Sequence, residues 1–307
     1  MRSRQAALKI HSILPTGLIL WALLAGCASF QPQPTTQSVN QTPRISPSTT
    51  PDPTFPTPIA TLTPGTPTSS PTPTCDSHQG QVQQVELTSK RMYEPFKMSI
   101  YLPPCYDLYA DRHYPSLYLF HGIYYSNDQW QRLGVTQLAD TLISKGEIPP
   151  FIIIMPYDPN GRDPSNTAFD EVFMEEALPY ADSHFRTIKS PAFRALGGLS
   201  RGAGWALHFG LTHAELFGAI GAHSPIIFWE DAPEIGTWLD AIPRAEMPRF
   251  YLDIGDQDPN NSSIDLLEGI LQERSIPFEQ HLNSGFHTEA YWSQHVEDYL
   301  RWYAAGW

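Results

Sequence analysis

Short apolar runs alternate with amphipathic segments from about residue 75 to the end of the chain. The run Phe151-Ile152-Ile153-Ile154-Met155 has no polar position, as is typical of a parallel strand buried on both faces. Further strands are predicted at 114–120, 193–196, 249–254 and 277–282, and helices at 169–185, from 205 onward, at 264–271 and at 290–303. This alternation predicts a single α/β domain over residues 75–307, with a mostly parallel central sheet and helices on both faces.

The first 26 residues have the pattern of an export signal. Basic residues precede an apolar run at 18–23, which is too short for a comfortable membrane span. The run ends in Leu24-Ala25-Gly26-Cys27, which resembles the lipobox of bacterial lipoproteins, where cleavage precedes the cysteine and its sulfur receives a diacylglyceryl group. We therefore expect a signal peptide over residues 1–26, a lipid on Cys27, and an exported protein anchored to the cell membrane or cell surface. An ordinary secretory signal, cut beside this cysteine, is the alternative.

Residues 27–74 are expected to form a linker. From Gln31 to Thr74 the chain is almost entirely Pro, Thr, Ser and Gln, without the apolar periodicity that a core requires. Proline favours extended polyproline II, and a segment of this length would span on the order of 100 Å. The composition favours a spacer between a lipid anchor and a folded domain, and a disordered tail without a role is the alternative.

The charge and the absence of several motifs exclude whole classes of function. The chain has 19 Lys and Arg against 32 Asp and Glu, a formal net charge of −13, which disfavours binding to nucleic acid or electrostatic attraction to anionic lipid. It contains no H-E-x-x-H, C-x-x-C or calcium-loop motif and no glycine-rich phosphate loop. We therefore expect neither a metal nor a cofactor.

The chain has three cysteines. If Cys27 carries a lipid, Cys75 and Cys105 are left as a pair in an exported protein, where a disulfide is expected. Such a bond would join the start of the domain to the end of its second strand and would stabilise it by roughly 3–4 kcal/mol. Two free thiols are the alternative.

The clearest chemical motif is Gly198-Leu199-Ser200-Arg201-Gly202, which fits G-x-S-x-G between a predicted strand and a predicted helix. This context is that of a nucleophile elbow, a sharp turn that lifts a serine hydroxyl above the sheet. The glycines two residues on either side of Ser200 remove Cβ atoms that would collide. The alternative role for a serine at this position is a helix N-cap.

An acid and a histidine follow Ser200 in the order Ser, Asp, His that this arrangement uses. Asp258 comes after one predicted strand, and His287 closes the turn after the next. A neutral imidazole can take the proton of a serine hydroxyl, and a carboxylate can hold the ring in the required tautomer. Asp253 lies within its strand and Asp256 is expected to stabilise the turn itself. We therefore predict Asp258 as the acid, with Asp256 as the alternative and a purely structural role as the other interpretation.

The loop after the strand 114–120 is predicted to supply part of an oxyanion hole. A carbonyl attacked by Ser200 becomes an oxyanion, which two backbone N–H groups must stabilise. We expect these groups to belong to Arg201, the residue after the nucleophile, and to Ile123, which follows a glycine that lets the backbone turn inward. His121, at the start of the loop, is expected to brace it, and a second catalytic histidine is the alternative.

Aromatic residues near these segments are candidates for the substrate pocket. They are Tyr124, Tyr125, Trp130, Trp205 and Phe286, together with the stretch 226–229 and Trp238. Aromatic side chains suit sugars and phenolic acyl groups because they offer large, flat apolar surfaces. They are equally the usual filling of a core, and the core is the interpretation that we favour for Trp130, Trp205, 226–229 and Trp238.

Several motifs between residues 82 and 302 match a known pattern. They are Ile100-Tyr101-Leu102-Pro103-Pro104-Cys105-Tyr106, Tyr118-Leu119-Phe120-His121-Gly122 with Asp128-Gln129-Trp130 after it, the G-x-S-x-G stretch and, more weakly, 211–218. The chain thereby resembles the bacterial putative-esterase family of the α/β-hydrolases, which includes esterase D and feruloyl esterases. The resemblance implies an α/β-hydrolase fold with Ser200 as nucleophile, Asp258 as acid and His287 as base. The segment Ile123-Tyr124-Tyr125 departs from the family, since many relatives are glycine-rich there, and this leaves the size of the acyl group open.

These observations predict a serine carboxylic-ester hydrolase that acts through an acyl-enzyme on Ser200. The substrate is expected to be a small-molecule or glycan-linked ester. The family that the chain resembles ranges from feruloyl and acetyl-xylan esterases to thioester hydrolases, siderophore esterases and mycolyltransferases, so the resemblance does not name the substrate. Acyl transfer to a sugar or lipid alcohol is one alternative, and a non-catalytic glycan-binding surface lipoprotein is another. The oligomeric state is left open.

Overall fold

The structure, a computed structural model, describes residues 74–159 and 161–307. The predicted signal peptide over 1–26, Cys27 and all but the last residue of the predicted linker 27–74 lie outside the described residues.

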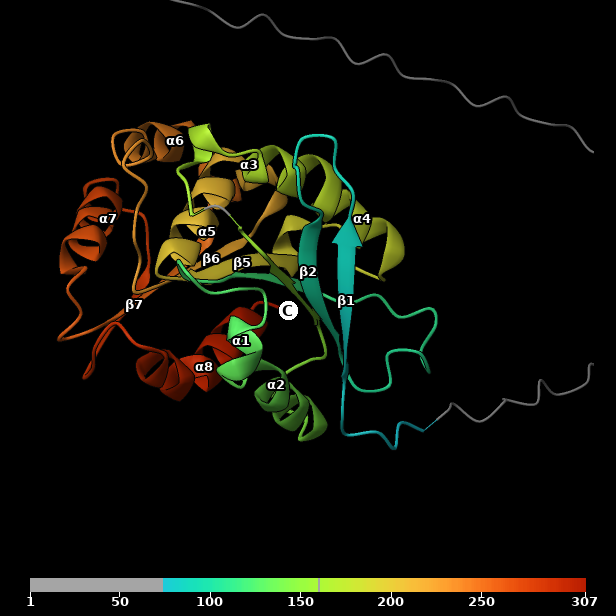
Figure 1. The fold of residues 1–307 in the computed structure, drawn as a ribbon. Coiled ribbons are helices and arrows are strands. Elements are labelled where there is room, and N and C mark those ends of the chain that lie inside the picture. The colour runs from blue at the N-terminus through green and yellow to red at the C-terminus, as the bar shows by residue number, and fades with distance from the viewer. Residues whose placement is uncertain (1–73, 160) are drawn as a thin grey trace, which may run out of the picture. The chain divides into compact units, whose positions relative to one another are not determined.

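An eight-stranded sheet runs through the centre of the described domain (Figure 1). Its strands follow the order β1-β2-β4-β3-β5-β6-β7-β8, in which β1 and β2 run antiparallel to their neighbours and β3 to β8 are mutually parallel. The strands are β1 (Gln81–Leu87), β2 (Phe96–Leu102), β3 (Ser116–Phe120), β4 (Ile152–Pro156), β5 (Arg194–Leu199), β6 (Ala219–His223), β7 (Arg249–Gly255) and β8 (Glu279–Asn283). The predicted mostly parallel sheet is confirmed.

Helices cover both faces of this sheet, as predicted (Figure 1). One face carries α1 (Gln129–Arg132), α2 (Val135–Ser144) and α8 (Glu289–Ala304). The other carries α3 (Phe169–Val172), α4 (Leu178–His184), α5 (Arg201–Thr212), α6 (Ile235–Ala241) and α7 (Asn261–Glu273). Each layer of helices closes its own apolar core against the sheet, because successive strand side chains point to opposite faces.

Two predicted elements differ from the structure at their boundaries. Helix α5 begins at Arg201 rather than near 205, because β5 and α5 are joined by the single residue Ser200. The helix predicted over 169–185 contains a π-helical turn at Phe173–Ala177 between α3 and α4. Pro179 follows this turn and has no N–H for the carbonyl four residues earlier, so the regular helix cannot pass through it unchanged.

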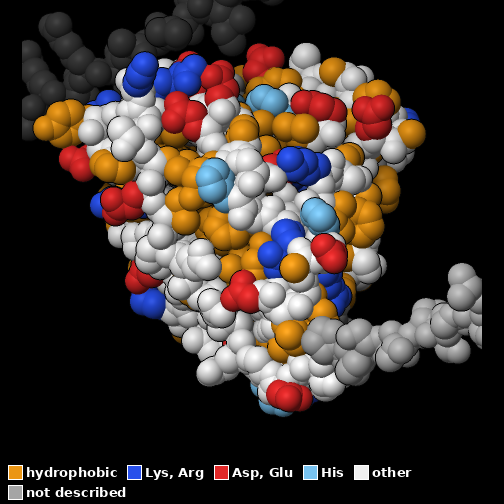
Figure 2. Space-filling model, turned by 90° about the vertical axis from the view of Figure 1, so that its right-hand side faces the viewer, with side chains coloured by type: hydrophobic (Ala, Val, Ile, Leu, Met, Phe, Trp, Pro, Cys, Tyr) orange, Lys and Arg blue, Asp and Glu red, His pale blue; other side chains and the backbone are white. Residues whose placement is uncertain are grey.

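The predicted disulfide between Cys75 and Cys105 is present, with the two Cα atoms 5.7 Å apart. It joins the start of the described domain to the loop after β2. The charges of the domain are mixed rather than segregated on the face at the β1 edge, where acidic and basic side chains alternate around apolar ones (Figure 2). This face therefore offers no continuous basic surface for nucleic acid.

Candidate active site

Ser200 occupies a sharp turn between β5 and α5, at the carboxyl end of the parallel strands. Its backbone has φ 56° and ψ −123°, a conformation that few non-glycine residues adopt. A Cβ on Gly198 would lie 2.0 Å from the carbonyl oxygen of Gly202, so the strand and the helix meet this closely only with glycine there. The neighbouring strand holds the turn, since Ser200 donates its N–H to the carbonyl oxygen of His223 at 2.8 Å.

His287 lies against Ser200 and Asp258. Its Nε2 is 2.8 Å from Ser200 Oγ, and its Nδ1 is 2.8 Å from Asp258 Oδ2. The structure thus brings together the three residues that the sequence analysis selected. Burial alone would raise the pKa of Asp258, but hydrogen bonds from His287, from the Asn260 backbone N–H and from the Ser224 hydroxyl hold that pKa below its usual value.

The two neighbouring acids are engaged elsewhere. Asp256 is exposed, and its Oδ1 accepts the backbone N–H of Gly285 at 2.9 Å, which fastens the turn before His287 to the turn after β7. Asp253 lies in β7 and is fully buried, and its carboxylate accepts the hydroxyls of Tyr291 and Tyr299 from α8 and contacts His223 Nδ1 at 2.6 Å. Neither carboxylate is within hydrogen-bonding distance of His287 among the described residues.

The loop after β3 places a tight turn beside the serine. Tyr125 donates its N–H to the carbonyl oxygen of Gly122, and Tyr124 has φ 68° within this turn. A Cβ built on Gly122 would lie 3.6 Å from the Cβ of Ser200, so the turn contacts the elbow directly. Among the described residues, no hydrogen bond occupies the backbone N–H of Ile123 or Arg201, the two groups predicted to form the oxyanion hole.

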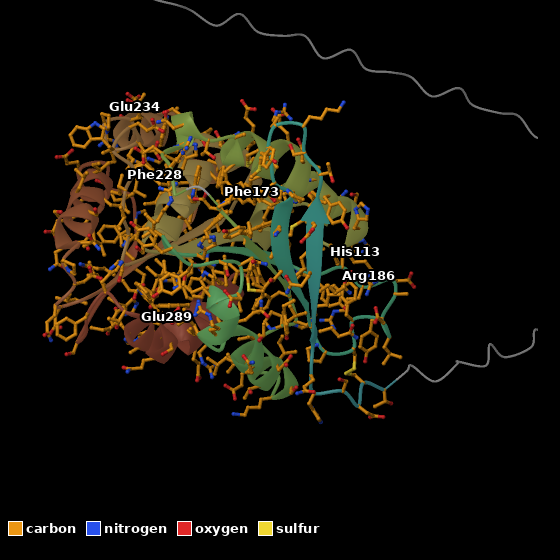
Figure 3. All side chains as sticks on the ribbon, viewed as in Figure 1. His113, Phe173, Arg186, Phe228, Glu234 and Glu289 are labelled. Atoms are coloured by element: carbon orange, nitrogen blue, oxygen red, sulfur yellow. A yellow bond between two sulfur atoms is a disulfide. The ribbon has the colours of Figure 1, made fainter. Side chains whose placement is uncertain are left out.

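Two buried side chains hold this turn in place. Gln129 accepts the N–H of Gly122 at 2.8 Å and donates to Glu289 at 3.1 Å, which ties the turn to the first turn of α8 (Figure 3). His121 contacts the carbonyl oxygen of Gly122 through Nδ1 at 2.7 Å and accepts the N–H of Asp158 at Nε2. Both contacts fit one neutral tautomer, and burial lowers the pKa of His121 accordingly. The geometry gives His121 the bracing role rather than a catalytic one.

Comparison with known proteins assigns the family. Residues 89–305, most of the chain, match the family described as Putative esterase. The chain belongs to this family. Its membership agrees with the enzyme class predicted from the sequence, a serine carboxylic ester hydrolase.

Two curated relatives match about half of the chain. An endo-1,4-beta-xylanase/feruloyl esterase from Xylanibacter ruminicola is 32% identical over 154 residues, which are 47% of this chain and 21% of that protein. The uncharacterized protein YjcH from Bacillus subtilis is 30% identical over 160 residues, 48% of this chain and 63% of that protein. The chain therefore matches a fifth of the first relative's length and less than two thirds of the second's.

Solved structures show the same fold at lower identity. A ferulic acid esterase has 22% identity and a TM-score of 0.67 over 75% of this chain and all of that one. The feruloyl esterase module from Clostridium thermocellum, in complex with sinapinate, has 16% identity and a TM-score of 0.63 over 73% of this chain and 88% of that one. The fluorophosphonate-binding serine hydrolase FphF from Staphylococcus aureus has 17% identity and a TM-score of 0.63 over 74% and 99%.

The aromatic residues predicted for the pocket of this esterase-family protein divide into two groups. Tyr124 is 95% exposed, Tyr125 and Phe286 are also exposed, and Phe286 directly precedes His287. The two tyrosines border a cavity of about 380 Å³ whose walls also include His121, Ile123, Tyr157, Asp158 and Arg201. A larger cavity of about 600 Å³ lies at the amino-terminal end of β7, away from Ser200.

Trp130 and Trp205 do not line the pocket, so their candidacy as pocket residues is wrong and the core interpretation is confirmed for both. Both are 1% exposed, and each fills the core on one face of the sheet. The indole of Trp130 donates to the carbonyl oxygen of Phe120, and that of Trp205 donates to Asp158. A large aromatic ring near the elbow is better placed between sheet and helix, where burial of its apolar surface stabilises the fold. In the stretch 226–229, Phe228 is buried and only the last residue, Trp229, is largely exposed.

Three polar residues that shape the site were not predicted from the sequence. They are Gln129, Asp158 and Asn260. Asp158 follows the apolar strand β4 and accepts Arg201 Nε at 3.0 Å, so it fixes the side chain next to the nucleophile. A carboxylate just past the end of a buried parallel strand is a sequence signal that could have identified Asp158 as a site residue. Gln129 belongs to the stretch Asp128-Gln129-Trp130 that carries part of the family resemblance, but nothing in that stretch indicates its contact with Gly122. Asn260 has no sequence signal for its contact with His287.

The described residues contain neither a candidate metal site nor a helix that could span a membrane. Between residues 74 and 307, leaving out 160, no cluster of three or more His, Cys, Asp or Glu side chains is arranged to hold a metal ion. Within the same residues, none of the helices has the length and apolar character needed to cross a bilayer.

Proposed function

We propose that the protein hydrolyses carboxylic esters through an acyl-enzyme on Ser200. The observation that carries this proposal is the chain of two 2.8 Å contacts from Ser200 Oγ through His287 to Asp258, in a member of an esterase family. His287 Nε2 takes the hydroxyl proton as Ser200 attacks the ester carbonyl, and the N–H groups of Ile123 and Arg201 stabilise the oxyanion. The intermediate then collapses, and the leaving alcohol takes the proton from His287.

Water completes the reaction in a second half of the same form. His287 removes a proton from water, the hydroxide attacks the acyl carbonyl, and Ser200 regains its proton as the free acid leaves. Asp258 remains ionised throughout because its pKa is held low, and it stabilises the imidazolium in both halves.

We further propose a small-molecule or glycan-linked ester as substrate, with feruloylated glycans as the first class to test. The names of two relatives support this class, since one is a xylanase/feruloyl esterase and one structural neighbour is a ferulic acid esterase. Exposed Tyr124, Tyr125 and Phe286 around Ser200 provide aromatic surface that suits phenolic or sugar groups. Export and attachment to a membrane through Cys27 are part of the same proposal and rest on the sequence around that cysteine.

Hydrolysis of a short-chain p-nitrophenyl ester by the full chain tests the activity. Ser200→Ala should lower kcat/KM by at least about 10³-fold. The exposed Ser262→Ala serves as the matched control and should leave the rate unchanged. A fluorophosphonate probe should add its mass to the peptide that contains Ser200. A Ser200→Ala protein that keeps most of its activity would refute the serine mechanism.

A further inference from the structure

Asn260 stands at the start of α7 without capping it. Asparagine at this position normally accepts a backbone N–H of the first helical turn through its side chain. Here the carbonyl of Asn260 accepts the N–H of Ser263, as at any helix start, but the side chain makes no capping hydrogen bond. The usual structural reason for an asparagine at this place is therefore missing.

The same residue contacts both partners of the proposed proton relay. Its backbone N–H donates to Asp258 Oδ1 at 2.9 Å, and its side-chain amide nitrogen Nδ2 is placed 3.1 Å from His287 Nδ1. Pro259 has no N–H, so Asn260 supplies the first backbone donor after Asp258. Since Asp258 Oδ2 is occupied by His287, the backbone of Asn260 engages the other oxygen and fixes the plane of the carboxylate.

The single proton on His287 Nδ1 decides which end of the amide faces the ring. Nδ1 donates that proton to Asp258 in the tautomer that leaves Nε2 free to accept the Ser200 proton. An amide NH₂ cannot donate to a nitrogen that already carries hydrogen, whereas an amide carbonyl can accept from it. Half a turn about the last side-chain bond of Asn260 exchanges its nitrogen and oxygen within the same space.

We infer that Asn260 is a positioning residue whose carbonyl oxygen shares the Nδ1 proton of His287 with Asp258. This inference rests on the proposed function. Two acceptors on one side of the ring hold the neutral imidazole in the productive tautomer and continue to face Nδ1–H when the ring becomes charged. Because the amide is neutral, it orients the ring without adding a second negative charge beside it.

Besides Asn260, three described residues contact His287. Ser200 lies at Nε2, Asp258 is the charged group from the turn after β7, and α8 contributes Trp292, whose uncharged ring meets the imidazole edge-on with the centroids 4.9 Å apart. A charge introduced at position 260 should therefore act on an imidazole that has one carboxylate partner, Asp258, within the described part of the chain.

Two variants of the full chain test the inference. Asn260→Leu keeps the size of the side chain and the backbone N–H but removes the acceptor, and it should lower kcat on the order of tenfold with KM unchanged. Asn260→Asp keeps the shape and adds a carboxylate beside Nδ1. It should move the midpoint of the rise of kcat/KM with pH upward by about one unit. The same two substitutions at exposed Asn261, the next residue, are the controls and should change neither quantity.

The outcomes separate this inference from the proposed function. If the wild type hydrolyses the ester and Ser200→Ala does not, the proposed function stands whatever Asn260 does. Within that result, a wild-type midpoint in Asn260→Asp overturns the positioning role, even if the melting temperature falls, because a purely structural role would not shift the midpoint. If Asn260→Leu does not fold, the pH midpoint of kcat/KM in Asn260→Asp is the measurement that tests the positioning role.

Discussion

At the scale of single residues, the choice of acid depends on what each neighbour already binds. The side chain of Asp253 contacts Tyr291, Tyr299 and His223 in the core. Asp256 accepts the Gly285 N–H, so Asp258 is the carboxylate that faces His287. Pro259 restricts the backbone of Asp258 to extended angles and Asn260 engages one of its oxygens, so the other is aimed at the imidazole.

Substituting each acid in turn should separate these roles. Asp258→Asn should lower kcat/KM on the order of 10³–10⁴-fold, because His287 loses both its orienting partner and the charge that stabilises the imidazolium. Asp256→Asn keeps an acceptor for the Gly285 N–H and should stay within about threefold of the wild type. Steady-state kinetics, with thermal melts to check folding, give the comparison. A large loss in Asp256→Asn beside a near-normal Asp258→Asn would reverse the assignment.

The sequence could predict the residues whose place follows from strand order, and it could not predict those that support them. Ser200 directly follows β5, and Asp258 and His287 lie in the turns after β7 and β8; parallel strands bring their carboxyl ends to one edge. Gln129 and Asn260 act through side chains that reach across a loop or to another turn. Neither hydrophobic periodicity nor spacing encodes such a contact, because it depends on the exact path of the backbone.

At the scale of elements, the turns after β7 and β8 form one unit. A Cβ on Gly255 would lie 2.3 Å from the carbonyl oxygen of Gly285, so the two turns touch backbone to backbone. Gln257 donates its N–H to that same oxygen, and Asp256 accepts the N–H of Gly285. The position of His287 therefore depends on the close approach of the backbone at Gly255 and Gln257 to that at Gly285, three residues that have no catalytic side chain.

Gly255→Ala should disrupt this unit. The added methyl group must displace the backbone carbonyl of Gly285. Because His287 follows Gly285 by two residues, the displacement should move the imidazole, and kcat/KM should fall on the order of 10²-fold. Gly269→Ala in α7 is the control, since its Cβ would meet nothing within 4 Å and should stabilise the helix by about 0.5–1 kcal/mol. Kinetics and thermal melts on both variants test the contrast. Unchanged activity in Gly255→Ala would show that the turns can adjust.

A second link between elements joins α5 to α3 and to the segment before α6. His208 of α5 lies 3.0 Å from Asp231 and 3.6 Å from Asp170. Burial alone would lower the pKa of His208, but the two carboxylates raise it to about 9. Since the ordinary pKa is about 6.5, protonated His208 stabilises the folded state fully below that pH, and this contribution is lost as the pH rises through about 9.

Stability should therefore fall in alkaline solution for a specific reason. Between pH 6.5 and pH 10 the free energy of unfolding should decrease by roughly 2–3 kcal/mol through this group. His208→Gln should be less stable at pH 6.5 and should lack this part of the pH dependence. Denaturant unfolding of both proteins across the range gives the difference curve. Parallel curves for the two proteins would exclude His208 as the source.

The regular elements were largely predictable, and the irregular ones were not. The buried strand Ile152–Pro156 has the uninterrupted apolar run that parallel packing requires, and α7 and α8 follow from their amphipathic periods. The start of α5 was placed too late, because Ser200 completes the turn alone and leaves no loop to recognise. The sequence left two places open for Trp130 and Trp205, because an aromatic residue beside an active site fits the same pattern whether it faces the substrate or the core, and the structure places both in the core.

At the scale of the whole molecule, the described domain has every group that the proposed reaction uses. Ser200, His287, Asp258 and the oxyanion turn all lie within the matched family region, 89–305. We propose that the preceding lipobox-like motif and Pro/Thr-rich segment determine where the reaction takes place. Location and catalysis should therefore be separable by substitution.

Cys27→Ser tests this separation, because serine cannot form the thioether to a diacylglyceryl group. The wild type should fractionate with membranes, since two or more acyl chains give stable attachment where one is marginal. Cys27→Ser should appear in the soluble fraction or remain unprocessed, and Ala28→Ser is the neighbouring control that should stay with the membrane. Cell fractionation, the mass of the mature N-terminus and p-nitrophenyl ester hydrolysis in each fraction provide the readouts. If Cys27→Ser and the wild type share the same fraction and the same mature N-terminus, the lipid anchor is excluded, while the esterase activity in that fraction still reports on Ser200 independently.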